Sequence, residues 1–414
     1  MIYTEQIQAV LQKEGKSQPT LIQKETYEAI KNGASLVALA KTGTGKTLAY
    51  ALPALERVIP GDKNSLVILA PTTELAVQIR NAILPFAKAL GLKTLALVGA
   101  GNRQRQDERL KKDNCEVLVC TPGRFFDFFS SGRIKLVQIK TLVIDEADDI
   151  LEFAKLELLS SLGQNLPSSS QILLFGATES QITQEAEEIF ARHFLLVDVR
   201  PDQGSQTEHV FLQVDNEHKL EYLQRLCKLD GFRGLLFFDS NEGMLRFARI
   251  FAHSKTRFEV LANNFSKDKR QQAIRDLAKG KVKLLLATDL AARGLDIPKL
   301  TYVVNYEIPT DANTYMHRAG RTGRMQQEGK VVSLGNDHDL RKLKKLLEGE
   351  VTVDRVYFAG YHLSKEKPVK KEKAEDKDKP AIIEQPVKKK KKSKKKNKNK
   401  GYHPHYLKGK KQSE

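Results

Sequence analysis

Short apolar runs that alternate with helix-like patterns limit the fold of this chain more than any other feature. Each run is followed by a polar or glycine turn and then by a helical pattern, which is typical of buried parallel strands joined by helices. The first five runs are Ser35–Ala40, Ser65–Ala70, Glu116–Cys120, Thr141–Ile144 and Gln171–Phe175. After a polar stretch near Pro201–Thr207 come Val210–Val214, Gly234–Phe238, Lys283–Ala287, Tyr302–Asn305 and Lys330–Leu334. We therefore expect an α/β protein with two parallel-sheet domains in tandem.

The distribution of charge sets a third region apart from these two domains. The 414 residues carry a net charge of +18, but residues 365–414 hold 20 Lys and 7 acidic residues, a net charge of +13. Residues 1–364 are left with only +5. Strand and helix periodicity disappears in this lysine-rich segment, so we expect it to be disordered. The predicted division is a first domain at 1–203, a second at 208–360 and a basic tail at 361–414.

Composition also argues against several classes of protein. The longest apolar runs, such as Leu66–Ala70, are far shorter than the roughly 20 residues that a membrane-spanning helix needs. The N-terminus has no charged-then-apolar leader, so we do not expect secretion. Cys115, Cys120 and Cys227 are odd in number and lack the paired spacing of a zinc site. We interpret them as reduced, buried thiols of a cytosolic protein.

A glycine-rich segment follows the first expected strand, at the edge of a parallel sheet where ligands bind. This segment, Ala40–Thr47, reads AKTGTGKT, and its glycines allow backbone N–H groups to wrap a phosphate at a helix N-terminus. We expect Lys46 to reach the β and γ phosphates and Thr47 to hold Mg²⁺. A plain glycine-rich turn is the alternative, although Gly-Lys-Thr at this offset is a demanding pattern, and Ala40 replaces the usual first glycine. The expected nucleotide-binding residues here are Thr42, Gly43, Thr44, Gly45, Lys46 and Thr47.

Two acids follow another expected strand and so reach the same edge of the sheet. Thr141–Ile144 runs directly into Asp145-Glu146-Ala147-Asp148. Asp145 suits Mg²⁺ coordination, and Glu146 suits orienting and deprotonating a water molecule. An acidic quartet taken alone is more often a solvated helix start. Beside a phosphate-binding loop, the catalytic interpretation is favoured.

Three arginines lie close together near the end of the second domain. They belong to the segment His317–Arg324, which reads HRAGRTGR. A surface patch is one interpretation. The functional one is that Arg321 and Arg324 meet the γ phosphate from the opposite domain as arginine fingers. Catalysis would then require the two domains to close.

Together these three segments closely resemble the ATP site of the DEAD-box RNA helicases, and further motifs of that family follow in order along residues 1–340. The resemblance, to small bacterial members of superfamily 2, implies two RecA-like domains with ATP in the cleft and RNA across both. Pro19–Gln23 resembles the family's Q motif, in which Gln23 reads adenine and implies ATP rather than GTP. Arg293–Asp296 resembles motif V, and by that similarity Gly294 and Asp296 touch the nucleotide.

Other segments resemble those that hold the nucleic-acid backbone in this family. They are Pro71–Ala76, Thr121–Arg124 and Ala287–Asp289. Contacts of this kind carry little sequence information. The RNA-binding residues that the resemblance implies are Thr72, Gly99, Thr121, Gly123, Arg124, Arg270 and Thr288.

The chain departs from the family pattern at several positions. Thr73 stands where the family has an arginine, which removes one cation from the expected RNA path. Gly176 replaces the serine of the motif that links hydrolysis to strand separation. Lys16 stands where an aromatic residue is common, so stacking on adenine is weaker or comes from Tyr3. None of these changes touches Lys46 or Glu146, so ATPase chemistry is better supported than efficient unwinding.

The resulting hypothesis is an ATP- and Mg²⁺-dependent RNA helicase that locally unwinds short RNA duplexes or remodels ribonucleoproteins. The alternatives are an ATP-dependent RNA clamp and an RNA chaperone whose activity lies in the tail. The tail is expected to tether RNA, because lysines that neutralise phosphates give sequence-independent, salt-sensitive binding. From the family, ribosome biogenesis is a plausible process and a bacterial cytoplasm the favoured location, with a nuclear location less favoured.

Overall fold

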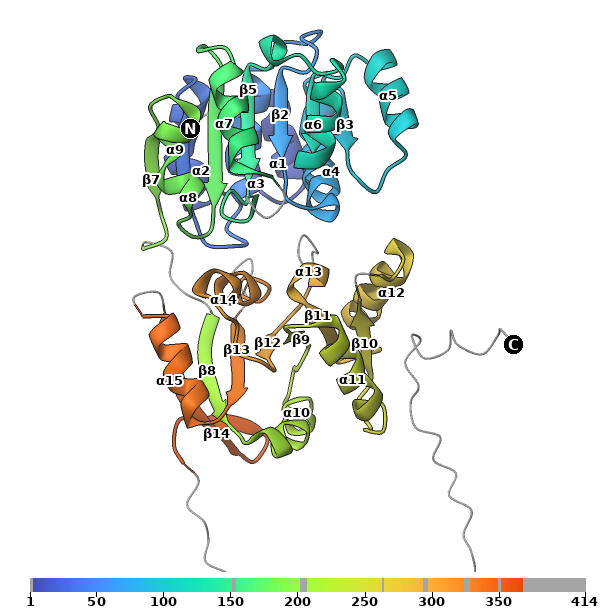
Figure 1. Cartoon of the computed structure of the whole chain (residues 1–414), viewed down its shortest axis with the longest axis vertical. Helices are drawn as coiled ribbons and strands as arrows, with labels where there is room; N and C mark the ends of the chain where they lie inside the picture. Colours follow the sequence, from blue (N-terminus) through green and yellow to red (C-terminus); the bar gives the residue numbers. More distant parts are fainter. Residues whose placement is uncertain are drawn as a thin grey trace, which may run out of the picture.

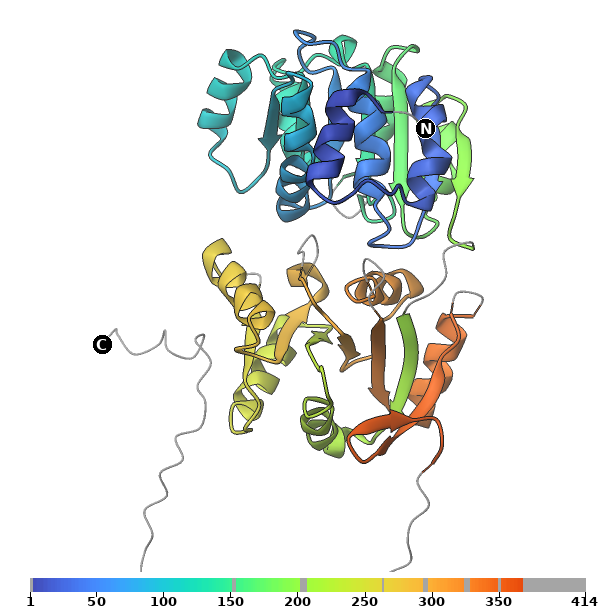
Figure 2. The same cartoon turned by 180° about the vertical axis from the view of Figure 1, so that it is seen from behind.

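The computed structural model describes residues 3–150, 154–201, 207–262, 264–292, 297–323, 328–348 and 351–367. Over these residues the chain forms two α/β domains, each built on a parallel β-sheet that is covered by helices on both faces (Figures 1 and 2). The predicted fold class is therefore confirmed. The tail at 368–414 and residues 202–206, between the two sheets, lie outside the described residues.

Domain 1 contains the elements that carry the glycine-rich loop and the acids. Its helices are α1 Glu5–Lys13, α2 Leu21–Lys31, α3 Lys46–Glu56, α4 Thr73–Ala89, α5 Arg103–Lys112, α6 Pro122–Ser130, the 3₁₀ helix η1 Leu136–Gln138, α7 Leu156–Asn165, α8 Gln181–Gln184 and α9 Ala186–Phe190. Its strands are β1 Leu36–Leu39, β2 Leu66–Leu69, β3 Thr94–Leu97, β4 Val117–Cys120, β5 Thr141–Asp145, β6 Gln171–Gly176 and β7 Leu195–Asp198.

The domain 1 sheet has the strand order β3-β4-β2-β5-β6-β1-β7 and is parallel throughout. Alternate residues of the central strands enter two separate hydrophobic cores. In β1, for example, Leu36 and Ala38 pack on one face and Val37 and Leu39 on the other. The five central strands are those that the sequence predicts. The two flanking strands, β3 and β7, were missed.

Domain 2 repeats this architecture. Its helices are the 3₁₀ helix η3 Asn216–His218, α10 Lys219–Leu226, α11 Asn241–Phe251, α12 Lys267–Ala278, α13 Asp289–Ala292, α14 Ala312–Ala319 and α15 Asp337–Leu346. Its strands are β8 Thr207–Gln213, β9 Gly234–Phe238, β10 Phe258–Leu261, β11 Leu284–Thr288, β12 Tyr302–Asn305, β13 Gly329–Gly335, β14 Asp354–Ala359 and β15 His362–Ser364.

The domain 2 sheet has the order β10-β11-β9-β12-β13-β8-β14-β15, in which only the terminal β14–β15 hairpin is antiparallel among the described strands. Five of these strands match predicted runs, whereas β10, β14 and β15 were missed. Helices α13 and α14 lie on the side of domain 2 that faces domain 1 (Figures 1 and 2). The last strand of the first sheet ends at Asp198 and the first strand of the second begins at Thr207. The domain limits at 203 and 208 stay a prediction.

The cysteines lie inside these cores. Cys115, Cys120 and Cys227 are buried and form no disulfide. Among the described residues, none of the helices combines the length and the apolar character needed to cross a membrane.

Candidate functional site

The glycine-rich loop connects β1 to α3, and α3 begins at Lys46. Gly43 and Gly45 have φ angles of 80° and 93°, which side-chain-bearing residues rarely adopt. A Cβ at Gly45 would also lie 2.8 Å from Nε2 of Gln23. The Lys46 ammonium donates to the carbonyl oxygen of Ala40 at 2.8 Å, so it lies back over its own loop. The loop therefore has the backbone geometry that phosphate binding requires.

Gln23 lies against this loop, although the two are 22 residues apart in the sequence. It is buried in α2, and its Nε2 donates to the carbonyl oxygen of Gly45 at 3.2 Å. Its Oε1 accepts from the backbone N–H of Thr20 at 3.1 Å. The Q-motif glutamine is thus fixed next to the phosphate loop. Of the two alternatives for stacking on adenine, the structure favours weaker stacking, because Tyr3 is buried in the core with its ring edge-on to Tyr27.

The two predicted catalytic acids lie at the end of β5. Asp145 is 4% exposed and accepts a hydrogen bond from the Tyr50 hydroxyl at 2.9 Å. Burial raises the pKa of the Asp145 carboxyl to about 6, Glu146 acts in the same direction, and Lys46 opposes both. Glu146 has a φ of 49°, a conformation that costs energy for a residue with a side chain. Its Oε2 is buried with no hydrogen-bond partner among the described residues.

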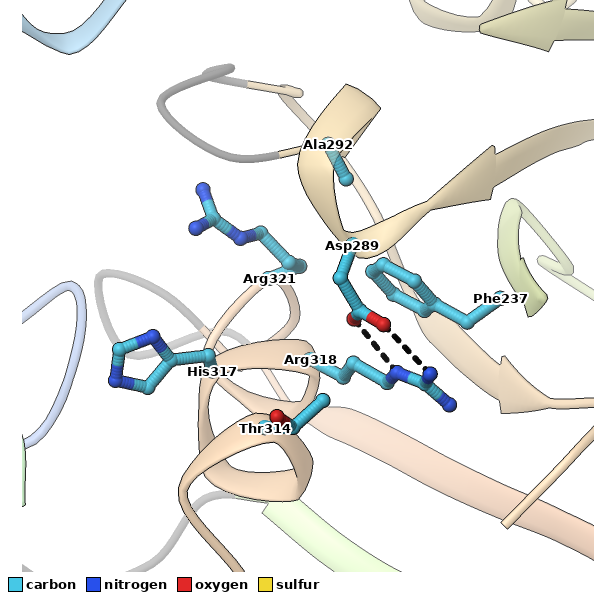
Figure 3. A pocket seen from close by; sticks show the side chains of 7 residues that line it. All are labelled: Phe237, Asp289, Ala292, Thr314, His317, Arg318 and Arg321. Atoms are coloured by element: carbon cyan, nitrogen blue, oxygen red, sulfur yellow. Dashed lines mark hydrogen bonds and ion pairs between the residues drawn. The ribbon is translucent and has the colours of Figure 1, made fainter. Parts of the chain in front are cut away.

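On the domain 2 side, a small pocket is lined by residues from β9, α13 and α14 (Figure 3). Arg318 is 2% exposed and forms a bidentate pair with Asp289, with both N–O distances 2.7 Å. Its guanidinium also donates to Asp239 at 3.0 Å and to the carbonyl oxygen of Glu307 at 3.1 Å. Sequence reasoning gave this arginine no role. All of these bonds lie within domain 2.

Arg321 lines the same pocket and projects from the end of α14 (Figure 3). Gly320, just before it, approaches the glycine-rich loop so closely that a Cβ there would overlap the side chain of Thr42. The arginine segment therefore lies against the phosphate loop of domain 1. Arg324, Gly294 and Asp296, which sequence reasoning also assigned to the nucleotide, lie outside the described residues.

Asp148 and His317 join the two domains. Oδ2 of Asp148 accepts from the backbone N–H and the hydroxyl of Thr178, each at 2.9 Å, and lies 3.2 Å from Nε2 of His317. The other ring nitrogen of His317 is 2.8 Å from Asp149. Burial alone would lower the pKa of His317, but its bonds to Asp148 and Asp149 raise it to about 10. The imidazolium in turn holds the pKa of Asp148 well below its usual range, despite burial.

The predicted RNA-binding residues of domain 1 gather at neighbouring strand ends. Gly99, Thr121 and Thr72 follow β3, β4 and β2, which are adjacent in the sheet. Thr72 caps α4 by accepting from the N–H of Leu75 at 3.2 Å. Arg124 donates to the carbonyl oxygens of Gly99 at 3.0 Å and Gly101 at 3.3 Å. The predicted RNA-binding segment that ends at Arg124 therefore contacts the predicted RNA-binding residue Gly99. A Cβ added at Gly123 would meet no other atom within 4 Å.

The predicted RNA-binding residues of domain 2 are arranged differently. Thr288 ends β11 and is buried. Arg270 on α12 forms an ion pair with Glu74 on α4, so it bridges the two domains. A second bridge joins Thr178 to Asn313 on α14. Sequence reasoning missed these interdomain contacts and the one between His317 and Asp148.

Two parallel-sheet domains, a phosphate loop after the first strand, acids at the end of β5 and an arginine segment from the second domain define a two-domain P-loop nucleotide hydrolase. Residues 20–186 match the family model "DEAD/DEAH box helicase", and residues 218–326 match "Helicase conserved C-terminal domain". The chain belongs to the DEAD-box family of ATP-dependent RNA helicases.

Individual relatives agree with this assignment. The probable ATP-dependent RNA helicase YfmL of Bacillus subtilis is 36% identical over 84% of this chain and 93% of that protein. The DEAD-box ATP-dependent RNA helicase CshC of Bacillus cereus is 34% identical over 91% of this chain and 96% of that protein. Among solved structures, S. cerevisiae Dbp5 bound to RNA and ADP BeF3 is similar with a TM-score of 0.73 and 26% identity, covering 86% of this chain and 94% of that one.

Proposed function

We propose that this protein is an RNA-stimulated ATPase that locally unwinds short RNA duplexes or remodels ribonucleoproteins. The observation that carries the proposal is the placement of the arginine segment of α14 directly against the phosphate loop, with Gly320 on Thr42. A nucleotide bound between them would contact both domains. The similarity to Dbp5, whose structure contains RNA and ADP BeF3, supports the same arrangement.

The residues of domain 1 fit ATP together with Mg²⁺. Asp145 is a carboxylate whose pKa is raised by burial and by Glu146 despite the opposing charge of Lys46, and Glu146 has a buried oxygen without a hydrogen-bond partner among the described residues. No stand-alone cluster of three or more metal-ligating side chains occurs in the described part of the chain. This suits Mg²⁺, which proteins usually hold with one or two carboxylates plus substrate phosphates. Thr47 and Asp145 would hold the ion, which would neutralise negative charge on the phosphates.

The side chains then have separate roles in hydrolysis. Lys46 would leave the carbonyl of Ala40 and bind the β and γ phosphates, while Gln23 reads the adenine. Glu146 would orient and deprotonate the attacking water. Arg321 and Arg324 would stabilise the charge that develops on the γ phosphate, with Gly294 and Asp296 as further nucleotide contacts. In such enzymes, arginines of this kind contribute roughly 10³ to 10⁵ in rate.

Closure of the two domains would convert hydrolysis into strand separation. Thr72, Gly99, Thr121, Gly123 and Arg124 would hold the RNA backbone on domain 1, with Arg270 and Thr288 on domain 2. A strand bent across both surfaces cannot remain in an A-form duplex, so a short helix separates locally. Loss of the γ phosphate weakens the bridge between the domains and releases the RNA.

The basic tail and the cellular setting complete the proposal. Residues 365–414, with a net charge of +13, would tether RNA through phosphate contacts. Removing the tail after Ser364 should raise the RNA concentration needed for half-maximal stimulation and flatten its salt dependence, with little change in saturated ATPase activity. Ribonucleoprotein substrates, a role in ribosome biogenesis and a bacterial cytoplasmic location belong to the same proposal.

The Glu146→Gln variant tests the chemistry. It keeps the size of the side chain and removes its basicity, so ATP and RNA binding should persist while turnover falls by at least about 10², the low end for a lost general base. Phosphate release with and without RNA is the measurement. The control is Glu188→Gln, because Glu188 is an exposed residue of α9. Unchanged phosphate release in Glu146→Gln would refute the proposal.

A clamp that binds RNA with little strand separation is the second candidate, and Gly176 favours it. Oδ1 of Asp148 is buried without a hydrogen-bond partner among the described residues, and a Cβ at Gly176 would lie 3.4 Å from it. A serine there could supply the missing donor. A duplex-displacement assay beside an ATPase assay separates the two functions, because a clamp hydrolyses slowly and displaces no strand. Full annealing activity in residues 365–414 alone would instead favour an RNA chaperone.

A further inference from the structure

A network of charged side chains lies where the chain leaves domain 1. Arg200 lies two residues after the end of β7. Pro201, which follows it, is the last residue of domain 1 that the structure describes. Its Nε is 2.9 Å from Oδ1 of Asp198, and its terminal nitrogen is 2.7 Å from Oδ2. The backbone N–H of Arg200 also donates to Asp198 at 3.0 Å. With a side chain only 20% exposed, Arg200 is held firmly at the end of the last strand of the sheet.

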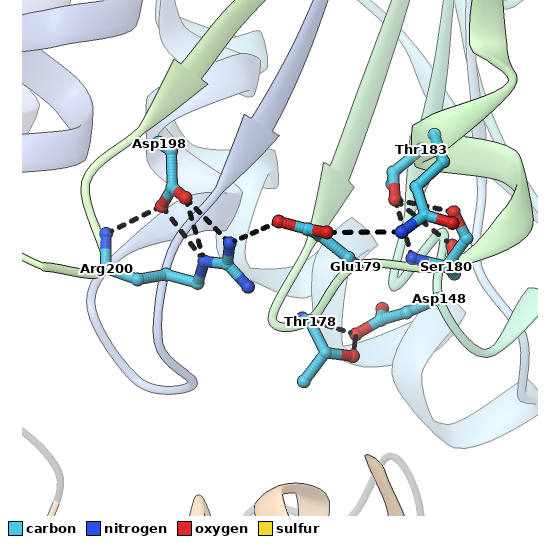
Figure 4. Close-up of polar contacts among 8 residues, drawn as sticks. Asp148, Thr178, Glu179, Ser180, Thr183, Asp198 and Arg200 are labelled. Atoms are coloured by element: carbon cyan, nitrogen blue, oxygen red, sulfur yellow. Dashed lines mark hydrogen bonds and ion pairs between the residues drawn. The ribbon is translucent and has the colours of Figure 1, made fainter. Parts of the chain in front are cut away.

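The same guanidinium reaches a second element (Figure 4). It donates to Oε1 of Glu179 at 2.9 Å, and Oε2 of Glu179 accepts from Gln184 at 3.2 Å. Glu179 lies in the loop that follows β6, 21 residues before Arg200. The contact therefore ties that loop to the start of the connection between the domains.

The loop after β6 also carries a contact to domain 2. Thr178, the neighbour of Glu179, donates to Asp148 and bonds to Asn313 on α14. Thr178 and Glu179 are neighbours in one short loop. Through them this loop bonds to Asp148, near the ATP site, and to Arg200, where the chain leaves domain 1. Among the described residues, no hydrogen bond or ion pair joins Glu179 or Arg200 to Lys46, Asp145 or Glu146, so the network lies beside the catalytic residues and not among them.

The charges in this network support one another. Bonding to Asp198, and then to Glu179, raises the pKa of Arg200 against the effect of burial. Gln184 and then Arg200 lower the pKa of Glu179, and Arg200 lowers that of Asp198. All three groups are therefore charged at neutral pH. A network with a bidentate arginine is more favourable than an isolated surface pair.

We propose that Arg200 is a positioning residue that holds the Gly176–Glu179 loop through Glu179, so that domain closure transmitted through Thr178 and Asn313 is coupled to strand separation. The inference rests on the proposed function. Without this tie, the loop could follow α14 while the end of β7 stays behind, and part of each closure would be lost. Hydrolysis itself would continue, because the ATP contacts do not depend on the tie.

The test compares duplex displaced per ATP hydrolysed, with both rates measured at saturating RNA and ATP. Glu179→Ala should lower this ratio about threefold, the size expected for a partly exposed ion pair, while the ATPase rate changes less than about twofold. Arg200→Ala should do the same, and the double variant should be no worse than Arg200→Ala, since both remove one contact. Glu179→Gln, which keeps the bond from Gln184, should fall between wild type and Glu179→Ala.

Matched controls separate coupling from stability. Glu242→Ala removes a comparable pair with Arg246, whose side chains are 84% and 75% exposed, and should leave the ratio unchanged. Asp198→Asn tests whether Arg200 needs its own strand as an anchor, and should resemble Glu179→Ala. An unchanged ratio in Glu179→Ala, or one that falls only in step with melting temperature, would overturn the inference. Wild-type protein that hydrolyses ATP but displaces no duplex would overturn the proposed function, and this inference with it.

Discussion

The two halves of the ATP site are built in opposite ways. In domain 1 the acids are buried without full compensation: burial raises the pKa of Asp145, although both of its oxygens accept hydrogen bonds, and Glu146 has an oxygen without a hydrogen-bond partner among the described residues. In domain 2 the buried Arg318 is bonded to two carboxylates and a carbonyl oxygen. The first half holds charge that a bound ligand would compensate, whereas the second is already complete. We therefore expect ligand binding to compensate charge in domain 1 and to leave the bonds of Arg318 in domain 2 unchanged.

The largest expected effect comes from disrupting the bonds of Arg318 in the domain 2 half of the ATP site. Arg318→Ala would remove the hydrogen bonds of a buried guanidinium to Asp289 and Asp239, whose side chains are 29% and 48% exposed, at a cost of about 1.5–3 kcal/mol. Urea unfolding of the variant should show a corresponding loss in the free energy of unfolding of domain 2. Arg246→Ala is the control, because that side chain is 75% exposed and its loss should be nearly neutral. If Arg318→Ala were as stable as wild type, the contrast between the halves would not hold.

A second prediction concerns the contact between the halves. Gly320→Ala places a methyl group against Thr42 and should prevent the two domains from closing, while each domain stays folded. We expect RNA-stimulated ATPase activity to fall at least about tenfold, which corresponds to about 1.4 kcal/mol. Interdomain distance, measured by FRET with an ATP analogue and RNA, should stay at its open value. Adding Thr42→Gly removes the obstructing side chain and should restore closure, and failure to do so would point to a different cause.

The pH dependence of closure sharpens the comparison further. The pKa of His317 is raised to about 10 by Asp148 and Asp149, against an unfolded value near 6.5. The contribution of protonated His317 to the contact between the domains is therefore fully present below pH 6.5 and is lost as pH rises through about 10. Closure measured by FRET should decline towards pH 10 in the wild type. His317→Gln should close less at pH 7 and lose most of that decline, and an equal decline in both proteins would contradict this role.

The smallest expected effect concerns the domain 1 half of the site, where Oδ1 of Asp148 has no hydrogen-bond partner among the described residues. Gly176→Ser would offer a hydroxyl donor to the unbonded Oδ1 of Asp148, and one such bond is worth about 0.5–1.5 kcal/mol. We expect more duplex displaced per ATP, by roughly two- to tenfold, with little change in ATP binding. Gly176→Ala is the matched control, because it adds the Cβ without the donor. An increase in both variants would show that volume, and not the hydrogen bond, matters.

Much of the fold was predictable because the central strands are continuous apolar runs. Two of the missed strands lack that signal: β7 is an edge strand in which Leu195 and Leu196 are exposed, and β14 begins with Asp354 and Arg355. The exposed edge and the polar start conceal these strands from a search for buried runs. Only the final pairing in the sheet identifies them.

The candidate site divides in the same way. The phosphate loop and the acids at Asp145 and Glu146 could be predicted, because each is a local pattern that follows a strand. The partners of Asp148 and Arg270 could not be predicted in this way. His317 is 169 residues from Asp148, and Glu74 is 196 residues from Arg270. No spacing rule along the chain links such pairs. Arg270 was assigned to RNA, and its pairing with Glu74 adds an interdomain contact to that prediction.

The buried cysteines have a practical consequence for following domain motion. Burial raises the pKa of Cys115 to about 11 and that of Cys227 to about 12, and raises the pKa of Cys120 as well. Since the thiolate is the reactive form, all three should resist maleimide dyes while the protein is folded. A cysteine introduced at an exposed position in each domain would then carry the fluorophores selectively. The native background therefore needs no cysteine replacement before closure is measured.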